Sequence, residues 1–200
     1  MRLYRAEWST NCERVTLALA HKGLEAEPVW IDYADRSAVE RVSGQGLVPV
    51  LEHDGTVVAD SQRILRYLDD AFPDAPLIPD DPWFDVFLEW FDGVWKGPPN
   101  AIEAAEEEGR TPDPAWSAQL REWLGRFERL LEGREYLLGP FSAADCVAYP
   151  FLKYGAGRDQ ADDELFHRIL ERELAFGNAH PRLAAWVRRV AERPGTYLLS

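Results

Sequence analysis

The stretch STNCERVTLALAHKGL, residues 9–24, carries the signals that decide how this chain folds. From Cys12 onward its apolar residues recur at helical spacing, and Gly23 stands where a left-handed C-cap ends a helix. The residues before it, RLYRA, have the length and composition of a short strand. The sequence therefore predicts a strand-to-helix junction with a hydroxyl residue, Ser9, at the head of the helix.

The residues that follow predict the rest of a small α/β unit. The segment AEPVWID (26–32) combines β-branched and aromatic residues at strand length. Two apolar runs in LVPVLEHDGTVVAD (47–60) flank the pair Asp54-Gly55, which is typical of a β-hairpin. Ser61 comes next, in position to cap a helix over QRILRYLDDAF. The predicted order is strand, helix, strand, irregular segment, hairpin, helix.

A proline-rich break separates this unit from a second one. FPDAPLIPDDP (72–82) contains four prolines in eleven residues, so neither a helix nor a strand can run through it. Beyond it the apolar residues recur at spacings of three and four. This periodicity predicts an all-helical unit, with helices in residues 82–95, 114–133, 142–154, 163–176 and 181–193.

The segment FSAADCVAYPFL (141–152) has a sharper local signal. Ser142 and Asp145 have the spacing of a capping box, and Phe141 and Cys146 occupy the hydrophobic-staple positions. The pattern predicts the start of a buried helix, and Pro150 predicts a kink in it.

Composition excludes several classes of function. The net charge is −13, with 8 basic against 14 acidic side chains in residues 1–80 and 14 against 21 in the remainder. Acidity spread in this way repels phosphate, so we expect neither nucleic acid nor an anionic membrane as a partner. The chain opens without an apolar leader, and two cysteines cannot build a disulfide framework, so we expect a soluble, cytoplasmic protein. The four histidines lack metal-ligand spacing, and we expect no metal site.

Five segments together resemble the cytosolic glutathione transferase family over essentially the whole chain. STNCERV is similar to its serine-type active-site segment in the phi-like form, LVPVL to its cis-proline strand, and DSQRIL to the acid–serine pair that opens a helix. FSAADCVAYPFL is similar to its capping box and staple, and HPRLAAWVRRVAERPG to its closing helix. The resemblance implies a thioredoxin-like domain over 1–75, a linker over 76–82 and an all-helical domain over 83–200.

In such a protein Ser9 would stabilise a thiolate. A free thiol is only a few per cent ionised at neutral pH, and a hydroxyl donor at a positive helix end lowers its pKa. The resemblance favours this role, and it suggests Asn11 as an assisting amide donor. Two alternatives stay open: Ser9 caps the helix and does nothing more, or Cys12, one turn into the helix, is the reactive group.

The tripeptide glutathione would be the co-substrate. The resemblance implies a cis bond at Val48-Pro49 that presents the Val48 backbone to an extended ligand, with Ser61 on the γ-glutamyl carboxylate and Asp60 on its ammonium group. The family usually has Glu where Asp60 stands, and often Gln or Lys where this chain has Leu47. Gln45 is the candidate to contact the glycyl end instead.

The resemblance implies conjugation of the glutathione thiol to a small apolar electrophile, as in detoxification, by a homodimer that uses the 83–95 helix. Trp8 and the aromatic residues of 83–95 are candidates to line the electrophile pocket, although aromatic residues at helical spacing more often form a core or an interface. Two other functions remain open: glutathione-dependent disulfide reduction, and non-catalytic ligand binding or scaffolding on the same fold.

Overall fold

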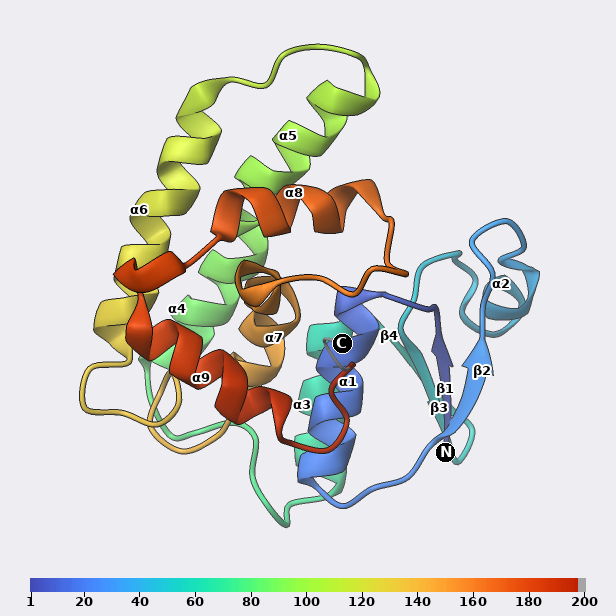
Figure 1. The fold of residues 1–200 in the computed structure, drawn as a ribbon. Helices are drawn as coiled ribbons and strands as arrows, with labels where there is room; N and C mark the ends of the chain where they lie inside the picture. Colours follow the sequence, from blue (N-terminus) through green and yellow to red (C-terminus); the bar gives the residue numbers. More distant parts are fainter. Residues whose placement is uncertain (198–200) are drawn as a thin grey trace. The chain divides into compact units, whose positions relative to one another are not determined.

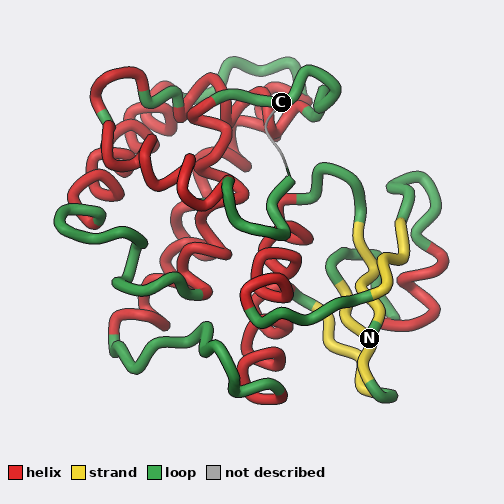
Figure 2. The backbone as a smooth tube through the Cα atoms, turned by 60° about the horizontal axis from the view of Figure 1, so that its bottom comes forward, coloured by secondary structure: helices red, strands yellow, loops and turns green. Residues whose placement is uncertain are grey.

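Figure 1 shows the computed structural model, which describes residues 1–197. These residues fall into two units. Unit 1 comprises Met1–Pro79 together with Arg193–Tyr197, and unit 2 contains Asp80–Glu192. Figure 2 shows the strands gathered in unit 1, and unit 2 built from helices and loops.

Unit 1 contains one mixed four-stranded sheet in the order β2-β1-β3-β4. Strand β1 pairs in parallel with β2, and antiparallel pairs join β1 to β3 and β3 to β4. The hairpin between β3 and β4 turns at Asp54 and Gly55, with φ of 49° and 79°, which confirms the predicted turn. The strands are β1 Arg2–Arg5, β2 Glu27–Trp30, β3 Val50–His53 and β4 Thr56–Ala59.

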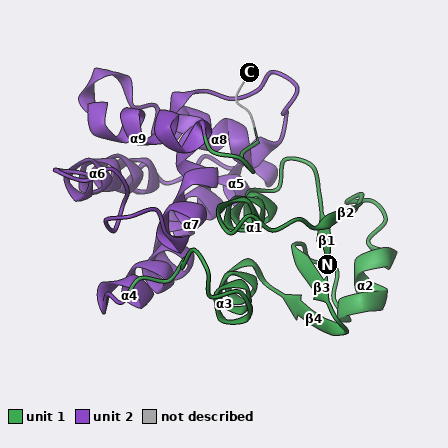
Figure 3. Ribbon diagram, turned by 90° about the horizontal axis from the view of Figure 1, so that it is seen from below, with its two compact units in different colours: residues 1–79, 193–197 green, residues 80–192, 198–200 purple. Residues whose placement is uncertain are grey.

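Helices cover both faces of this sheet, α2 on one and the pair α1 and α3 on the other (Figure 3). Strand alternation explains the two layers. Tyr4 and Val50 pair across β1 and β3 and pack with Val39 of α2, whereas the neighbouring buried pair, Leu3 and Leu51, points to the opposite face. The helices of the unit are α1 Thr10–His21, α2 Ser37–Ser43 and α3 Ser61–Ala71.

Unit 2 contains six α-helices among its described residues, one more than the sequence predicts. The additional helix, α5, begins at Gly97-Pro98-Pro99, where prolines in the first turn need no backbone partner for their missing N–H groups. A π-helical turn, Phe91–Trp95, joins α4 to α5. The helices are α4 Trp83–Trp90, α5 Gly97–Glu107, α6 Pro114–Leu130, α7 Ala143–Leu152, α8 Leu165–Leu174 and α9 Pro181–Ala191.

The predicted capping box is present at the head of α7, whose ten residues are all buried. The Asp145 carboxylate accepts hydrogen bonds from the backbone N–H of Leu137 and of Ser142, at 3.0 Å each. It also accepts one from Nε1 of Trp186 in α9, at 2.8 Å. One buried side chain therefore joins three segments of unit 2.

The fold class predicted from the sequence is confirmed: a thioredoxin-like α/β unit and an all-helical unit. Within residues 1–197, no helix has the length and hydrophobicity needed to cross a bilayer.

Candidate functional site

The register of the sheet brings three predicted segments to one end of unit 1. Tyr4, Val50 and Ala59 lie side by side on β1, β3 and β4. The chain reaches Ser9 just after β1, passes through Val48-Pro49 just before β3, and reaches Asp60-Ser61 directly after β4. We call the residues of these segments, with Asn11, the candidate thiol site.

Ser9 is the N-cap of α1. Its Oγ accepts a hydrogen bond from the backbone N–H of Cys12 at 3.3 Å, and the residue is 9% exposed. Accepting this bond leaves the hydroxyl proton available, because a serine hydroxyl can donate and accept at once. Capping and thiol stabilisation are therefore compatible roles for one side chain. Asn11 lies half-buried in the first turn of the same helix.

Cys12 is fully buried. Burial raises the pKa of its thiol, and the Ser9 side chain, the Ala6 backbone and the positive charge of Arg5 oppose this shift more weakly. The thiolate is the reactive form, so burial disfavours reaction at Cys12 in this conformation.

The peptide bond between Val48 and Pro49 is cis, which confirms the prediction. Among the described residues, none forms a hydrogen bond with the N–H or C=O of Val48, which lies just before β3. A backbone in this position can pair with an extended ligand. Leu47, the residue before it, is 68% exposed.

The Gln45 side chain folds back onto its own loop. Its Oε1 accepts from the Leu47 N–H at 2.5 Å, and its Nε2 donates to the Leu47 carbonyl at 3.0 Å and to Ser43 Oγ at 3.1 Å. These bonds occupy the amide that the sequence suggested for the glycyl end of a ligand. In this conformation Gln45 shapes the loop.

Helix α3 begins one residue earlier than the sequence suggests. Asp60, and not Ser61, is the N-cap, and its carboxylate accepts from the Arg63 N–H at 3.1 Å. The prediction of Ser61 as the cap is wrong because Asp60 adopts a non-helical backbone, with φ of 81° and ψ of 131°, that ends β4 and starts the helix. Asp60 stays exposed, whereas Ser61 is 4% exposed in the first turn.

Arg14 is the residue of this site that sequence analysis missed. It is fully buried in α1, and its Nη1 donates to Ser61 Oγ at 3.3 Å, which joins α1 to the first turn of α3. The periodic pattern predicts a single apolar stripe on α1, but the helix is buried almost all round, charged residues included. An arginine next to the apolar Val15 was the available signal.

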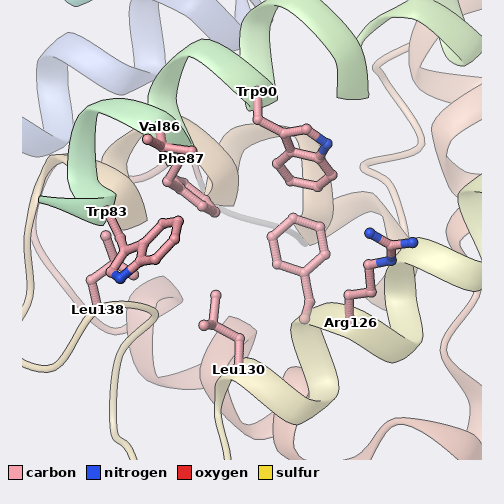
Figure 4. A pocket seen from close by; sticks show the side chains of 8 residues that line it. Trp83, Val86, Phe87, Trp90, Arg126, Leu130 and Leu138 are labelled. Carbon is pink, nitrogen blue, oxygen red and sulfur yellow. The ribbon is translucent and has the colours of Figure 1, made fainter.

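Unit 2 has an apolar pocket of its own, with a volume of about 390 Å³ (Figure 4). Trp83, Phe87 and Trp90 of α4 reach into it from one side, and α6 supplies the opposite wall. Arg126 is the single charged residue among those that line it, which are Trp83, Val86, Phe87, Trp90, Arg126, Phe127, Leu130 and Leu138. Phe84, Phe91 and Trp95 are instead core residues.

In the part of the chain that the structure describes, no three His, Cys, Asp or Glu side chains are grouped closely enough to hold a metal ion.

Comparisons with known proteins give consistent matches. Residues 3–76 match the family model "Glutathione S-transferase, N-terminal domain", and residues 105–194 match "Glutathione S-transferase, C-terminal domain". Glutathione transferase omega-1 of Caenorhabditis elegans is 28% identical over 195 residues, which cover 94% of this chain and 76% of that protein. Protein IN2-1 homolog B of Oryza sativa is 32% identical over 162 residues, 76% of this chain and 64% of that protein.

Solved structures show the same fold. A Tau class glutathione S-transferase from mango has a TM-score of 0.75 at 19% identity and covers 98% of this chain, which covers 90% of it. A glutathione S-transferase from Methylobacillus flagellatus with bound glutathione has a TM-score of 0.73 at 24% identity, with 97% of this chain and 96% of that one covered.

Proposed function

The chain belongs to the glutathione S-transferase family, and we propose that it activates the thiol of glutathione at Ser9 for conjugation to a small apolar electrophile. The observation that carries the proposal is the position of Ser9 as the N-cap of α1, at the same sheet end as Val48-Pro49 and the start of α3. A hydroxyl proton and the positive end of a helix both act there on a sulfur anion.

The chemistry requires a modest electrostatic effect. Lowering the pKa of the glutathione thiol by two units changes its ionisation free energy by about 2.7 kcal/mol and raises the thiolate fraction at neutral pH about tenfold. Ser9 supplies a donor to the sulfur, and Asn11 supplies a second one from the first helical turn. The thiolate then attacks a carbon of the electrophile to form a carbon–sulfur bond. In a substitution the leaving group departs with the electron pair of its bond to that carbon, and in an addition the displaced π electrons take up a proton.

The rest of the site holds the tripeptide. We assign the main chain of the cysteinyl residue to the backbone of Val48, with cis Pro49 fixing its orientation. The γ-glutamyl carboxylate lies at the N-terminus of α3 against Ser61, and its ammonium group against Asp60. Buried Arg14, which donates to Ser61 Oγ, adds a positive charge beneath that carboxylate. Gln45 acts on the glycyl end by fixing the Leu47 backbone.

We propose a cytoplasmic, detoxifying role. Both cysteines, Cys12 and Cys146, are free and buried, which fits a reducing compartment. The electrophile is a small apolar compound, and Trp8 is the aromatic residue of unit 1 closest in sequence to Ser9.

The test is calorimetric titration with reduced glutathione beside an ultraviolet difference spectrum for bound thiolate. We expect wild type to bind with a thiolate signal, and Ser9→Ala to lose that signal and about 10-fold or more of conjugation, with little change in affinity. Ser9→Gly separates the two roles of the residue, because glycine is nearly as good an N-cap as serine but has no hydroxyl. It should lose activity as Ser9→Ala does while keeping the stability of α1.

Two outcomes contradict the proposal. Full activity in Ser9→Gly together with inactivity of Cys12→Ala would assign the chemistry to Cys12 and favour disulfide reduction. No binding at millimolar glutathione would show that exposed Leu47 and short Asp60 leave the tripeptide unheld, and the protein would then be a non-catalytic member of its family.

A further inference from the structure

The chain returns to unit 1 at its C-terminal end. Residues Arg193–Tyr197, which we call the C-terminal strap, follow α9 and belong to unit 1 with the sheet and α1. Their hydrogen bonds run along α1. Tyr197 N donates to Glu13 Oε1 at 2.8 Å, the Gly195 carbonyl accepts from Thr16 Oγ1 at 2.6 Å, and Arg193 Nη2 lies 3.0 Å from His21 Nδ1.

These contacts run in an antiparallel sense. Tyr197 meets the first turn of α1, Gly195 its middle and Arg193 its last turn. Positions 13 and 16 are neighbours on one face of the helix, because residues three apart lie side by side there, and position 21 lies in its last turn. The strap therefore lies along α1 over its whole length.

Gly195 shows how closely the strap approaches the helix. Its φ is +86°, and a Cβ at this position would overlap the carbonyl oxygen of Thr16 and approach the Cβ of Ala20 to 2.9 Å. Only glycine combines this backbone conformation with this contact. The strap is thus held by backbone packing as well as by hydrogen bonds.

The end of the strap covers a group of buried charged and polar residues. Glu13, which accepts from Tyr197 N, is 1% exposed. The Tyr197 ring centre lies 4.8 Å from the Arg5 guanidinium, which also lies 4.6 Å from the ring of Trp30. Burial raises the pKa of the Tyr197 hydroxyl, and the positive charge of Arg5 opposes this shift more weakly. Cys12 lies four residues before Thr16, which donates to Gly195, so Cys12 and Thr16 are neighbours on the face of α1 that the strap crosses.

We propose that the C-terminal strap seals the Cys12 thiol, so that its release turns an inert buried cysteine beside Ser9 into a reactive one. Cys12 is fully buried, and it lies one turn before Thr16, at the end of α1 where the strap runs from Gly195 to Tyr197. Without the strap, water reaches this end of α1. Burial is the chief factor that raises the pKa of the Cys12 thiol, while Ser9, the Ala6 backbone and Arg5 all lower it. Hydration therefore leaves a thiol whose neighbours favour the thiolate, which is the nucleophilic form.

The test is the rate of alkylation by N-ethylmaleimide under native conditions, mapped to each cysteine by mass spectrometry. Gly195→Ala and Tyr197→Ala release the strap in two independent ways, by overlap with Thr16 and by loss of the ring over Arg5. We expect each to raise the labelling rate of Cys12 at least 10-fold above wild type. Tyr197→Phe keeps the ring and should leave the rate near that of wild type.

Two controls are present in the chain. Gly23→Ala places alanine at a positive φ of +65° at the end of α1, where nothing lies within 4 Å of the added Cβ, so it matches the backbone strain of Gly195→Ala without the overlap. Cys146, fully buried in α7, reports global unfolding.

The proposal is supported if Cys12 is labelled faster in the strap variants while Cys146 stays protected and Gly23→Ala behaves like wild type. Unchanged labelling of Cys12 in both strap variants overturns it. Equal labelling of Cys12 and Cys146 overturns it as well, because the thiol would then be exposed by unfolding of the whole chain. No outcome depends on glutathione, so the strap and the proposed transferase activity are tested separately.

Discussion

Backbone strain marks the heads of two helices in unit 1. Trp8, directly before the N-cap of α1, has φ of 59°, and Asp60, the N-cap of α3, has φ of 81°. Non-glycine residues rarely adopt such values, and those that do gather at ligand sites, where the surroundings enforce them. Of the four positive-φ residues other than glycine in the described chain, Asp60 therefore belongs to the candidate thiol site and Trp8 directly precedes it.

Arg14 gives the residue-scale prediction. Replacement of Arg14 by Met removes the donor to Ser61 Oγ and a buried positive charge near the proposed carboxylate position. We expect the free energy of unfolding to fall by about 3 kcal/mol, because a buried group loses its partner. We also expect glutathione affinity to fall about tenfold, or about 1.4 kcal/mol. Urea unfolding and calorimetry measure the two effects.

Arg14→Lys is the matched variant, because it retains the charge but not the planar set of donors. It should recover most of the affinity and less of the stability. If Arg14→Met folds and binds glutathione as wild type does, Arg14 has only a structural role and the proposed carboxylate position is wrong.

Sequence alone could predict Ser9 but not Arg14. A hydroxyl residue before an apolar helical pattern is a local signal, readable within a few residues. The burial of Arg14 depends on Ser61, 47 positions away in sequence, and on elements that surround α1 on nearly every side. Hydrophobic periodicity describes one buried stripe, so it cannot identify a charged residue buried on another face.

At the scale of elements, the head of α7 depends on one carboxyl group. Burial raises the pKa of Asp145 to about 6, from an ordinary value of 3.8, against the hydrogen bonds from Leu137, Trp186 and Ser142. A group with a higher pKa in the folded state binds its proton more tightly there. Proton binding by Asp145 therefore contributes about 3 kcal/mol to the free energy of unfolding below about pH 4. This contribution is lost as the pH rises through about 6.

Urea unfolding followed by tryptophan fluorescence tests this sign. Asp145→Asn cannot titrate at this position and serves as the reference. When the pH is lowered from 7.5 to 5, the free energy of unfolding of wild type should rise by about 1.5 kcal/mol relative to that of Asp145→Asn. Ser142→Ala keeps the buried carboxyl group and should follow the pH dependence of wild type. If wild type instead becomes less stable than Asp145→Asn as the pH falls, the hydrogen bonds outweigh burial and hold the carboxylate ionised.

Element boundaries were predictable where the signal is local. The hairpin at Asp54-Gly55 and the capping box at Ser142 are short motifs with one physical solution, and both are present. Helix α5 was not predicted, because Gly97-Pro98-Pro99 reads as a break although prolines in a first turn are compatible with a helix start. The cap of α3 was misassigned for a similar reason: Asp60 and Ser61 are both good caps, and only the backbone conformation decides between them.

At the scale of the whole molecule, sequence patterns predict two units but not the course of the last residues. The linear division places residues 193–197 with the helices, whereas they pack with unit 1. Their contacts with α1 span more than 170 positions in sequence, and no periodic pattern encodes such a pairing. Gly195 near the end of a helix reads as an ordinary C-terminal stop.

The apolar surface of unit 2 leads to the last prediction, that two copies of this chain associate. Trp83 is 68% exposed and Val86 is 51% exposed, and both line the pocket of about 390 Å³ between α4 and α6. Contiguous exposed apolar surface of this kind is uncommon on a monomer. Each copy carries a net charge of −13, so electrostatic repulsion opposes association and added salt should strengthen it by screening.

Sedimentation velocity at micromolar concentration measures this association. We expect wild type to sediment as a dimer, more completely at 0.5 M than at 0.05 M salt, and Trp83→Glu to sediment as a monomer because it adds a charge to the apolar surface. Trp116→Glu is the matched control: Trp116 is 37% exposed on α6 of the same unit and lies outside the residues that line the pocket. A dimer that persists in Trp83→Glu, or is lost equally in Trp116→Glu, would place the interface elsewhere. A monomeric wild type at both salt concentrations would leave the α4 surface to a different partner.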